Sequence, residues 1–354
     1  MIVTMIEKVY TFLWGDLVKI PLPGGSTLGI SLLILLLIPT GIYFTIRTKL
    51  LPIRLFPDMV RALSEKKSDK NNLSAFQTLI VSTATRVGMG NLVGVVAAIS
   101  AGGAGAVFWM WVSALLGMAS SFAECSLAQL YKERDSKGQF RGGPAWYMAR
   151  GLGMRWMGVL FAIFLLIAYG LIFNSVQANS VSHALTFAFD IPPLFTGIAL
   201  AIVSLLAIVG GIKGVARLMQ WFVPMMALLW VGCSIVICLW HFGQLPGIIM
   251  TIIKSAFGWQ EAAAGAAGYT LSQAIASGFQ RGMFSNEAGM GSTPNAAASA
   301  ASWPPHPAAQ GIVQMIGVLV DTLILCTASA MIVLLAGNDA SYVPMEGIQL
   351  LQKA

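Results

Sequence analysis

Long apolar stretches alternate with short polar connections along the chain. A helix needs about 20 apolar residues to cross a bilayer, and eight stretches come near that length. They lie at about 28–47, 74–99, 106–130, 156–188, 194–211, 216–240, 267–298 and 309–336. The pattern therefore predicts an all-α polytopic membrane protein with eight crossings.

Three further segments are too short or too polar to cross. Residues 1–25 mix charged and aromatic side chains, which favours an amphipathic segment at the membrane surface. Residues 246–258 are apolar but too short to span, so they predict an external interfacial helix. Residues 337–354 are polar enough to begin an external loop or a re-entrant helix.

The composition fits a membrane protein. Of the 354 residues, 57% are hydrophobic and only 10% are charged, whereas about 25% are charged in soluble domains. The mean hydropathy is +0.78. The four cysteines fall within apolar spans without metal-binding spacing, so we interpret them as buried reduced thiols.

The net charge of +7 comes mostly from two basic connections. Lys and Arg concentrate in cytoplasmic connections, so the N-terminus and the end of this chain are predicted to lie outside a cytoplasmic (inner) membrane. The basic residues are Arg47, Lys49, Arg54, Arg61, Lys66, Lys67, Lys70, Lys132, Arg134, Lys137, Arg141, Arg150 and Arg155. Contact with membrane lipids explains them, and no nucleic-acid partner is predicted.

One stretch, Ser82 to Gly94, puts glycines, hydroxyls and an amide into the middle of a span. Gly88, Gly90 and Gly94 each lower helix stability by about 1 kcal/mol relative to alanine. Backbone that leaves the helix at membrane depth is tolerated only beside protein or water. We expect a break that binds a small solute: amides freed near Gly88–Asn91 suit a carboxylate, and freed carbonyls suit an ammonium or Na⁺.

A second interrupted segment, Ser277 to Pro294, lies five spans later. Two interrupted segments in corresponding places of two halves indicate the site of a secondary transporter. Small residues also let helices pack closely, and this alternative explains an isolated Gly-x-Gly. The presence of both segments favours a solute site.

Polar side chains occur inside other spans. Gln177 either lines the same cavity or makes an ordinary interhelical hydrogen bond. An unpaired charge near the membrane centre costs at least about 2.5 kcal/mol, so we expect gating or structural ion pairs, with Arg86 or Arg281 as the partner of Asp321. The charged residues concerned are Arg86, Glu124, Arg281, Glu287 and Asp321.

The sequence does not predict an enzyme. It holds no nucleophile with a base at motif spacing, no His-Glu-x-x-His motif and no phosphate-binding loop. It also lacks a K⁺-channel filter signature. We expect no organic cofactor and no metal other than Na⁺.

The chain resembles the alanine or glycine:cation symporter family, the sodium:alanine symporters, over nearly its whole length. The resemblance includes Thr-Arg-Val-Gly-Met-Gly-Asn-Leu-Val-Gly at 85–94 and Ser-Asn-Glu-Ala-Gly-Met-Gly-Ser-Thr-Pro-Asn at 285–295. Further matching motifs occupy 105–111, 141–148, 176–179 and 321–327. Several long motifs in the right order make this resemblance specific.

The resemblance implies a LeuT-like core of two inverted five-span repeats, preceded by one extra N-terminal span. Residues 1–73 would carry the surface segment, the extra span and a basic connection. Residues 74–240 would form the first repeat, and 241–354 would form part of the second. Because such a core has ten spans, we expect the second repeat to be incomplete in this chain.

The resemblance also implies Na⁺-driven symport of alanine or glycine by alternating access. The implied substrate-binding residues are Ser82, Thr85, Gly88, Met89, Gly90, Asn91, Gln177, Phe279 and Gly282. The implied sodium ligands are Thr83, Ala84 and Val87, with the rest of that site outside this chain. Met89 stands where the resemblance leads us to expect Thr, so we expect a hydroxyl ligand to be missing, whereas a backbone contact would survive the change. The alternative is an inactive truncated membrane fragment or a partner subunit of such a transporter.

Overall fold

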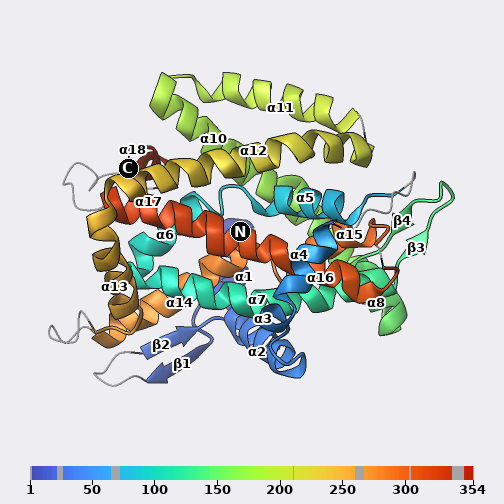
Figure 1. The fold of residues 1–354 in the computed structure, drawn as a ribbon, viewed down its shortest axis with the longest axis horizontal. Helices are drawn as coiled ribbons and strands as arrows, with labels where there is room; N and C mark the ends of the chain where they lie inside the picture. The colour runs from blue at the N-terminus through green and yellow to red at the C-terminus, as the bar shows by residue number, and fades with distance from the viewer. Residues whose placement is uncertain are drawn as a thin grey trace.

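The chain is built almost entirely of helices, most of which run in similar directions (Figure 1). This computed structural model describes residues 2–21, 27–64, 72–209, 211–259, 267–302, 304–336 and 347–353. Within these ranges, four helices are long and apolar enough to cross a membrane, at 105–130, 155–189, 214–240 and 307–336. Shorter apolar helices lie at 32–47, 93–102 and 193–209. The multi-pass, mostly helical prediction is confirmed, whereas the count of eight crossings stays a prediction.

Two of the long helices contain π-helical turns. The first consists of α9 (Arg155–Ile167), η1 (Ala168–Phe173) and α10 (Asn174–Phe189). The second consists of α16 (Pro307–Val318), η4 (Leu319–Cys326) and α17 (Thr327–Ala336). Hydrophobic periodicity gave no sign of these turns, because a π turn shifts a helix face without changing its overall apolar character.

Both predicted helix breaks are confirmed. The first separates α5 (Ala75–Arg86) from α6 (Val93–Gly102), and Ser74 caps the start of α5 with a capping box. The second separates α14 (Ala267–Asn286) from α15 (Thr293–Ala298). Here the sequence placed the interruption too early: residues 277–286 remain helical, and the backbone leaves the helix only after Asn286.

The two broken helices run antiparallel. Leu73, just before α5, forms a β-bridge with Ala300, just after α15. At the other end, Gly102 of α6 lies against Ala274 of α14. Figure 1 shows the same pairing, with α5 near α15 and α6 near α14. The two breaks therefore meet in the interior of the bundle.

The helix α7 (Gly105–Leu130) forms the centre of the bundle and contacts both α14 and α16. A β-carbon on Gly278 would lie 2.5 Å from the Ala106 carbonyl oxygen of α7, so α14 and α7 approach at backbone distance. Gly278 and Gly282 were predicted to interrupt α14, but they instead allow this close packing. In a membrane, such packing holds helices together where the hydrophobic effect does not.

The outer face is formed by α9–η1–α10, α11 (Pro193–Val209) and α12 (Gly211–Trp240). Only 6% of the apolar window in 155–189 is buried, against 50% in α7 and 56% in 307–336. Figure 1 shows α10 and α11 at the upper edge of the bundle. These helices present apolar side chains outward, as a lipid-facing surface does.

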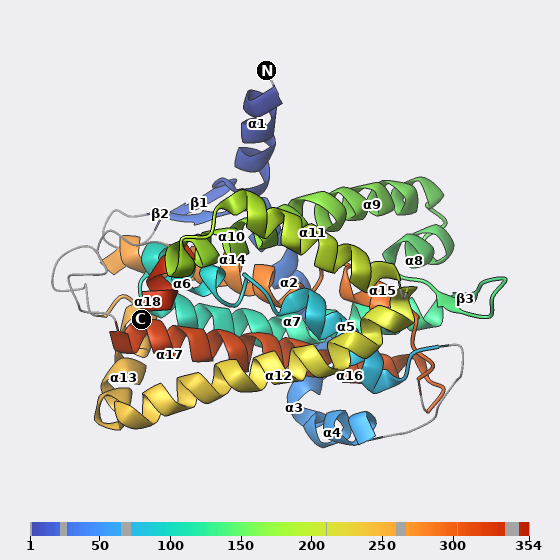
Figure 2. The ribbon, with the colours of Figure 1, turned by 90° about the horizontal axis from the view of Figure 1, so that it is seen from above.

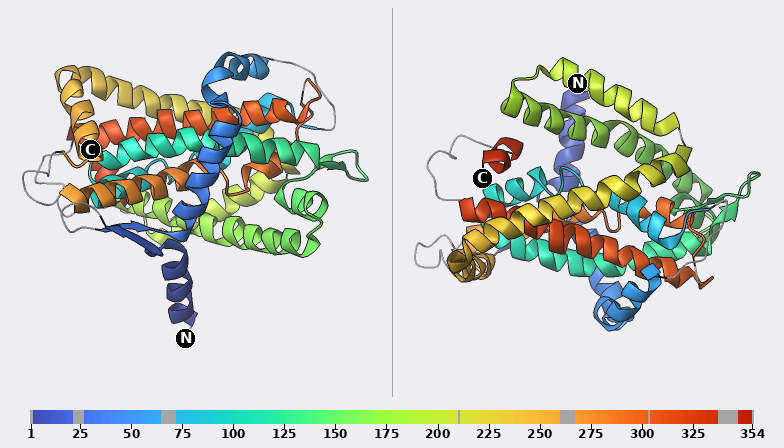
Figure 3. Two further views of the ribbon diagram at one scale, coloured as in Figure 1. Left: turned by 90° about the horizontal axis from the view of Figure 1, so that it is seen from below. Right: turned by 45° about the horizontal axis from the view of Figure 1, so that its top comes forward.

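The N-terminal region contains structure that the sequence only partly predicted. The helix α1 (Ile2–Trp14) projects from the bundle, as Figures 2 and 3 show, and agrees with a segment that does not cross. It is followed by an antiparallel pair, β1 (Val18–Pro21) and β2 (Thr27–Ile30), which was not predicted. These strands are too short to show a period-two pattern. The helix α2 (Leu32–Arg47) then leads to α3 (Leu51–Arg54) and α4 (Phe56–Ser64).

The remaining connections are short. A hairpin whose strands have two residues each, β3 (Glu133–Arg134) and β4 (Phe140–Arg141), precedes α8 (Pro144–Gly151). The short helix predicted at 246–258 is present as α13 (Leu245–Ala256), reached from α12 through η2 (Phe242–Gln244), and its place at the membrane surface stays a prediction. At the end of the chain, α18 (Gly347–Lys353) packs against α6 and α10. Two parts of the chain with predictions lie outside the described residues. They are the predicted cytoplasmic lysines Lys66, Lys67 and Lys70, and the segment 337–346.

Candidate functional site

At the first break, backbone N–H groups that leave the helix donate hydrogen bonds to side-chain amide oxygens. The Gly88 N–H donates to Asn91 Oδ1 at 2.9 Å, and the Met89 N–H donates to Gln177 Oε1 at 3.1 Å. A β-carbon on Gly88 would lie 2.5 Å from Gln177 Nε2, so glycine leaves room for the Gln177 amide at this contact. The expected grouping of Gly88, Met89, Asn91 and Gln177 is therefore present.

A buried polar node joins both breaks. Asn91 Nδ2 donates to Asp321 Oδ1 at 2.6 Å and to Ser285 Oγ at 3.1 Å. Ser285 Oγ in turn donates to Asp321 Oδ2 at 2.8 Å. Asn91 comes from the first break, Ser285 from the end of α14 and Asp321 from η4. One carboxylate thus ties three separate membrane segments together.

The π turn η4 explains how Asp321 and Cys326 reach the same node. Residues five apart lie on one face of a π turn, whereas they diverge on an α-helix. Cys326 Sγ lies 3.1 Å from Ser285 Oγ and accepts from Asn91 Nδ2 at 3.4 Å. Ser285 was not predicted as a site residue, although it begins the resemblance motif at 285–295.

Arg86 is buried and makes only neutral hydrogen bonds. Its Nη2 donates to Thr293 Oγ1 at 2.8 Å and to Ser121 Oγ at 3.3 Å. None of the ion pairs in the described part of the chain involves Arg86 or Arg281. The expected Asp321–arginine pair is therefore absent there, because Asn91 and Ser285 already hold the Asp321 carboxylate.

Two further buried carboxylates lie at the second break. Glu287 has a left-handed backbone (φ 53°), and its Oε2 accepts from Ser292 Oγ at 2.5 Å and from Thr85 Oγ1 at 3.4 Å. Glu124 Oε1 accepts from the Gly289 N–H at 3.2 Å. They were predicted as ion-pair partners; in the structure Glu124 accepts from a backbone N–H of the second break, and Glu287 accepts from hydroxyls of both broken helices.

A cavity of about 290 Å³ opens beside the first break. The break contributes Gly88, Met89 and Asn91 to its wall, and α10 contributes Gln177. Its opposite wall is apolar and comes mainly from α12, whose Trp230 was not predicted as a site residue. The cavity thus has polar backbone on one side and apolar side chains on the other, which suits a small amphipathic solute.

Other predicted residues lie around the break, and most of them do not line this cavity. Ser82 Oγ donates to Gln314 Oε1 at 2.6 Å, so it faces α16. Gly90 packs against Ser285 and Phe284 of α14. Among the predicted sodium ligands, Val87 lines the cavity, and the Thr83 carbonyl accepts from the Val87 N–H at 2.8 Å. Ala84 is half-buried in α5.

The predicted residues Phe279 and Gly282 lie elsewhere on α14. Phe279 belongs to an apolar cluster with Ile34 of α2, and its ring centroid is 5.7 Å from that of Trp109 of α7. Gly282 abuts Ser113 and Met110 of α7. Because α14 stays helical to Asn286, these two positions precede the break by one to two turns. The aromatic side chain nearer the first break is Phe284, which stacks on Phe173 of η1 with centroids 5.3 Å apart.

Lipid-facing helices around two antiparallel broken helices, with a small cavity at one break, define a membrane protein of the secondary-transporter class. Residues 23–354 match the sequence model of the sodium:alanine symporter family, and the chain belongs to that family. It is therefore a member of a transporter family and not of an enzyme family.

Sequence similarity to known transporters supports this membership. The chain is 67% identical to the uncharacterized transporter YaaJ of Escherichia coli (strain K12) over 330 residues, which are 93% of this chain and 69% of YaaJ. It is 48% identical to the Probable sodium/glutamine symporter GlnT of Bacillus subtilis (strain 168), over 91% of this chain and 66% of GlnT. It is 36% identical to the sodium/alanine symporter AgcS of Methanococcus maripaludis, over 96% of this chain and 72% of AgcS. The chain spans about two thirds of the length of these relatives.

Proposed function

We propose that this chain carries out Na⁺-coupled symport of a small neutral amino acid, alanine or glycine, by alternating access. The observation that carries the proposal is the cavity beside the first break, where polar backbone faces an apolar wall. Family membership and the name of AgcS support Na⁺ as the coupling ion and alanine as the solute. The cavity volume of about 290 Å³ favours a small side chain.

The substrate carboxylate would bind the amides of Gly88 to Asn91. These amides lie just before α6, near the positive end of that helix, where an anion is stabilised. The Gln177 amide now accepts from the Met89 N–H, so this side chain is placed to contact the carboxylate. The substrate methyl group or hydrogen would face Trp230 and Met226 of α12.

Sodium would bind at the end of α5, through oxygens of Thr83, Ala84 and Val87. The carboxyl end of a helix carries partial negative charge and unpaired carbonyls. Val87 has extended backbone (ψ 104°), so its carbonyl leaves the direction of the α5 axis. Oxygen ligands of this kind suit Na⁺. We propose no other metal and no organic cofactor for this chain.

We also propose the LeuT-like inverted repeat as the origin of the two antiparallel breaks. Its support is that α5 packs with α15 and α6 with α14 in opposite directions, while α7 packs against α16. Arg86, Glu124 and Glu287 would then hold the two breaks together during the transport cycle. The proposed location is the cytoplasmic membrane, with the N-terminus and Lys353 outside.

Binding of radiolabelled alanine to the purified chain, in Na⁺ and in K⁺, tests the proposed site. We expect saturable binding that needs Na⁺ and that glycine displaces. Gln177→Ala should weaken binding about tenfold, the equivalent of one hydrogen bond of about 1.4 kcal/mol.

Asn174→Ala is the matched control, because Asn174 is an exposed amide on the same helix that donates to the Gly170 carbonyl. It should leave alanine binding unchanged. Equal losses in both variants, or binding that is the same in K⁺, would contradict the proposed site.

A further inference from the structure

A second cavity, of about 650 Å³, lies between the β3–β4 hairpin, α8 and the start of α9. It is remote in sequence from both breaks. Its charged wall consists of Glu133, Arg150 and Arg155. Its apolar wall is formed by small side chains of α8 and by Val159 and Ala162 of α9. The cavity thus has a cationic part and an apolar part.

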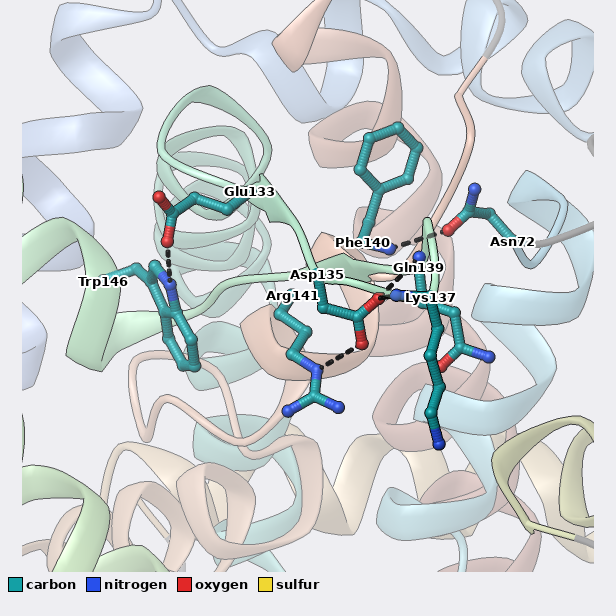
Figure 4. Close-up of polar contacts among 8 residues, drawn as sticks. All are labelled: Asn72, Glu133, Asp135, Lys137, Gln139, Phe140, Arg141 and Trp146. Carbon is teal, nitrogen blue, oxygen red and sulfur yellow. Dashed lines mark hydrogen bonds and ion pairs between the residues drawn. The ribbon is translucent and has the colours of Figure 1, made fainter.

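The hairpin side of this cavity is fixed by polar contacts. Glu133 accepts from Trp146 Nε1 at 3.1 Å, as Figure 4 shows, and its other oxygen pairs with Arg150. In the same hairpin, Asp135 pairs with Arg141 at 2.9 Å, and Arg141 does not line the cavity. Glu133 is thereby neutralised by Arg150.

Arg155 supplies the excess positive charge. It is exposed, and none of the hydrogen bonds or ion pairs recorded for the described residues holds its side chain. With one carboxylate and two guanidinium groups, the cavity wall carries a net charge of +1. A single anionic group would balance this charge.

The position of Arg155 relative to the membrane identifies the kind of anion. Arg155 is the first residue of the 35-residue apolar helix 155–189. Immediately beyond it, Trp156, Val159 and Phe164 are 66%, 53% and 60% exposed, as on a lipid-facing surface. An arginine and a tryptophan at the start of such a helix lie at the depth of the lipid head groups.

We propose that this cavity binds one anionic phospholipid, with its phosphate on Arg155 and Arg150 and an acyl chain along Val159 and Ala162. A free phosphate ion would balance the charge but would leave the apolar wall in contact with water. The continuity of the cavity with the exposed face of α9 lets a lipid enter from the bilayer. Binding at this site would join α8 and the hairpin to the membrane surface.

Native mass spectrometry of the detergent-solubilised chain with added phosphatidylglycerol or phosphatidylcholine tests the proposal. One phosphatidylglycerol should remain bound preferentially. Arg155→Gln should weaken this binding about fivefold, as expected for one cation at a membrane surface. Ala162→Phe, which fills the apolar wall, should also reduce retention of phosphatidylglycerol.

Arg54→Gln is the matched control, because Arg54 is an exposed arginine of α3 that does not line the cavity. It should leave retention unchanged. Equal losses in Arg54→Gln and Arg155→Gln would overturn the proposal in favour of general surface charge. Displacement of phosphatidylglycerol by inorganic phosphate at similar concentration would overturn it in favour of a free anion.

Discussion

At the scale of single residues, the central feature is the Asp321 carboxylate. It accepts hydrogen bonds from Asn91 and Ser285, and it is fully buried. The sequence showed that a charge inside a span needs partners. It could not show that the partners are neutral, because the π turn that aims Asp321 at the two breaks leaves no trace in apolar periodicity.

Asp321→Asn should destabilise the protein by about 1–3 kcal/mol, since an amide cannot accept from both donors and leaves a buried group unsatisfied. The expected observation is a lower thermal midpoint in detergent. Asp190→Asn is the control, because Asp190 ends α10 with a left-handed backbone that asparagine tolerates. If both variants unfold at the wild-type temperature, the node does not hold the three segments together.

Gly88→Ala tests the contact between the first break and α10. A β-carbon there would lie 2.5 Å from Gln177 Nε2, at the end of a flexible side chain that can move. We therefore expect alanine binding to weaken at least about tenfold while the thermal midpoint changes little.

Gly197→Ala is the matched control, because a β-carbon at Gly197 of α11 would meet nothing within 4 Å. Its alanine affinity should equal that of the wild type. Unchanged affinity in Gly88→Ala would show that Gln177 and the break do not form one site.

At the scale of elements, the sequence predicted the breaks because glycines and polar residues inside an apolar span are costly in a continuous helix. The first break occurs within the predicted stretch, at residues 87–92. The second begins at Glu287, later than expected, because Gly278 and Gly282 serve close packing with α7. Glycine has both uses, and only the neighbouring helix decides between them.

Gly291→Ala should loosen the second break. Gly291 has a φ of +81°, and a β-carbon there would lie 2.6 Å from the Phe161 ring. Gly153→Ala separates the strain of a left-handed backbone from the clash of the added β-carbon, since Gly153 has a φ of +70° but open space around it. Gly153→Ala should cost only the left-handed strain, about 1–2 kcal/mol, and Gly291→Ala should cost more. Hydrogen exchange at residues 287–292 is the measurement, and equal protection in Gly291→Ala and wild type would contradict the expectation.

The β3–β4 hairpin should keep its contacts throughout the pH range of transport assays. Hydrogen bonds from the Gln139 and Lys137 amides, and the charge of Arg141, lower the pKa of Asp135 below its ordinary value of 3.8. Because the pKa of Asp135 is lower in the folded state, its carboxylate stabilises the hairpin at pH values above the pKa of the unfolded chain. This contribution is lost only as the pH falls through the folded-state pKa.

Carboxyl NMR of labelled Asp135 should therefore show a titration below pH 3.8, and Arg141→Gln should move it upward. A midpoint at or above the ordinary value would contradict the hairpin contacts.

At the scale of the whole molecule, family membership and the four long apolar helices establish a multi-pass member of the sodium:alanine symporters. The antiparallel pairing of the broken helices brings polar groups from residues 91, 285 and 321 together. The order of residues in the sequence does not reveal this contact, because the three positions are separated by up to 230 residues. The two interrupted segments in the sequence predicted a shared site, but no sequence pattern identified the residues that meet there.

The central claim is that this chain couples Na⁺ to the movement of a small amino acid. Uptake of labelled alanine into proteoliposomes containing only this chain, with and without an inward Na⁺ gradient, tests it most directly. The account predicts accumulation that requires the gradient and that Asn91→Ala abolishes. Absence of gradient-driven accumulation by a folded chain that still binds alanine would contradict it and favour a non-transporting membrane protein.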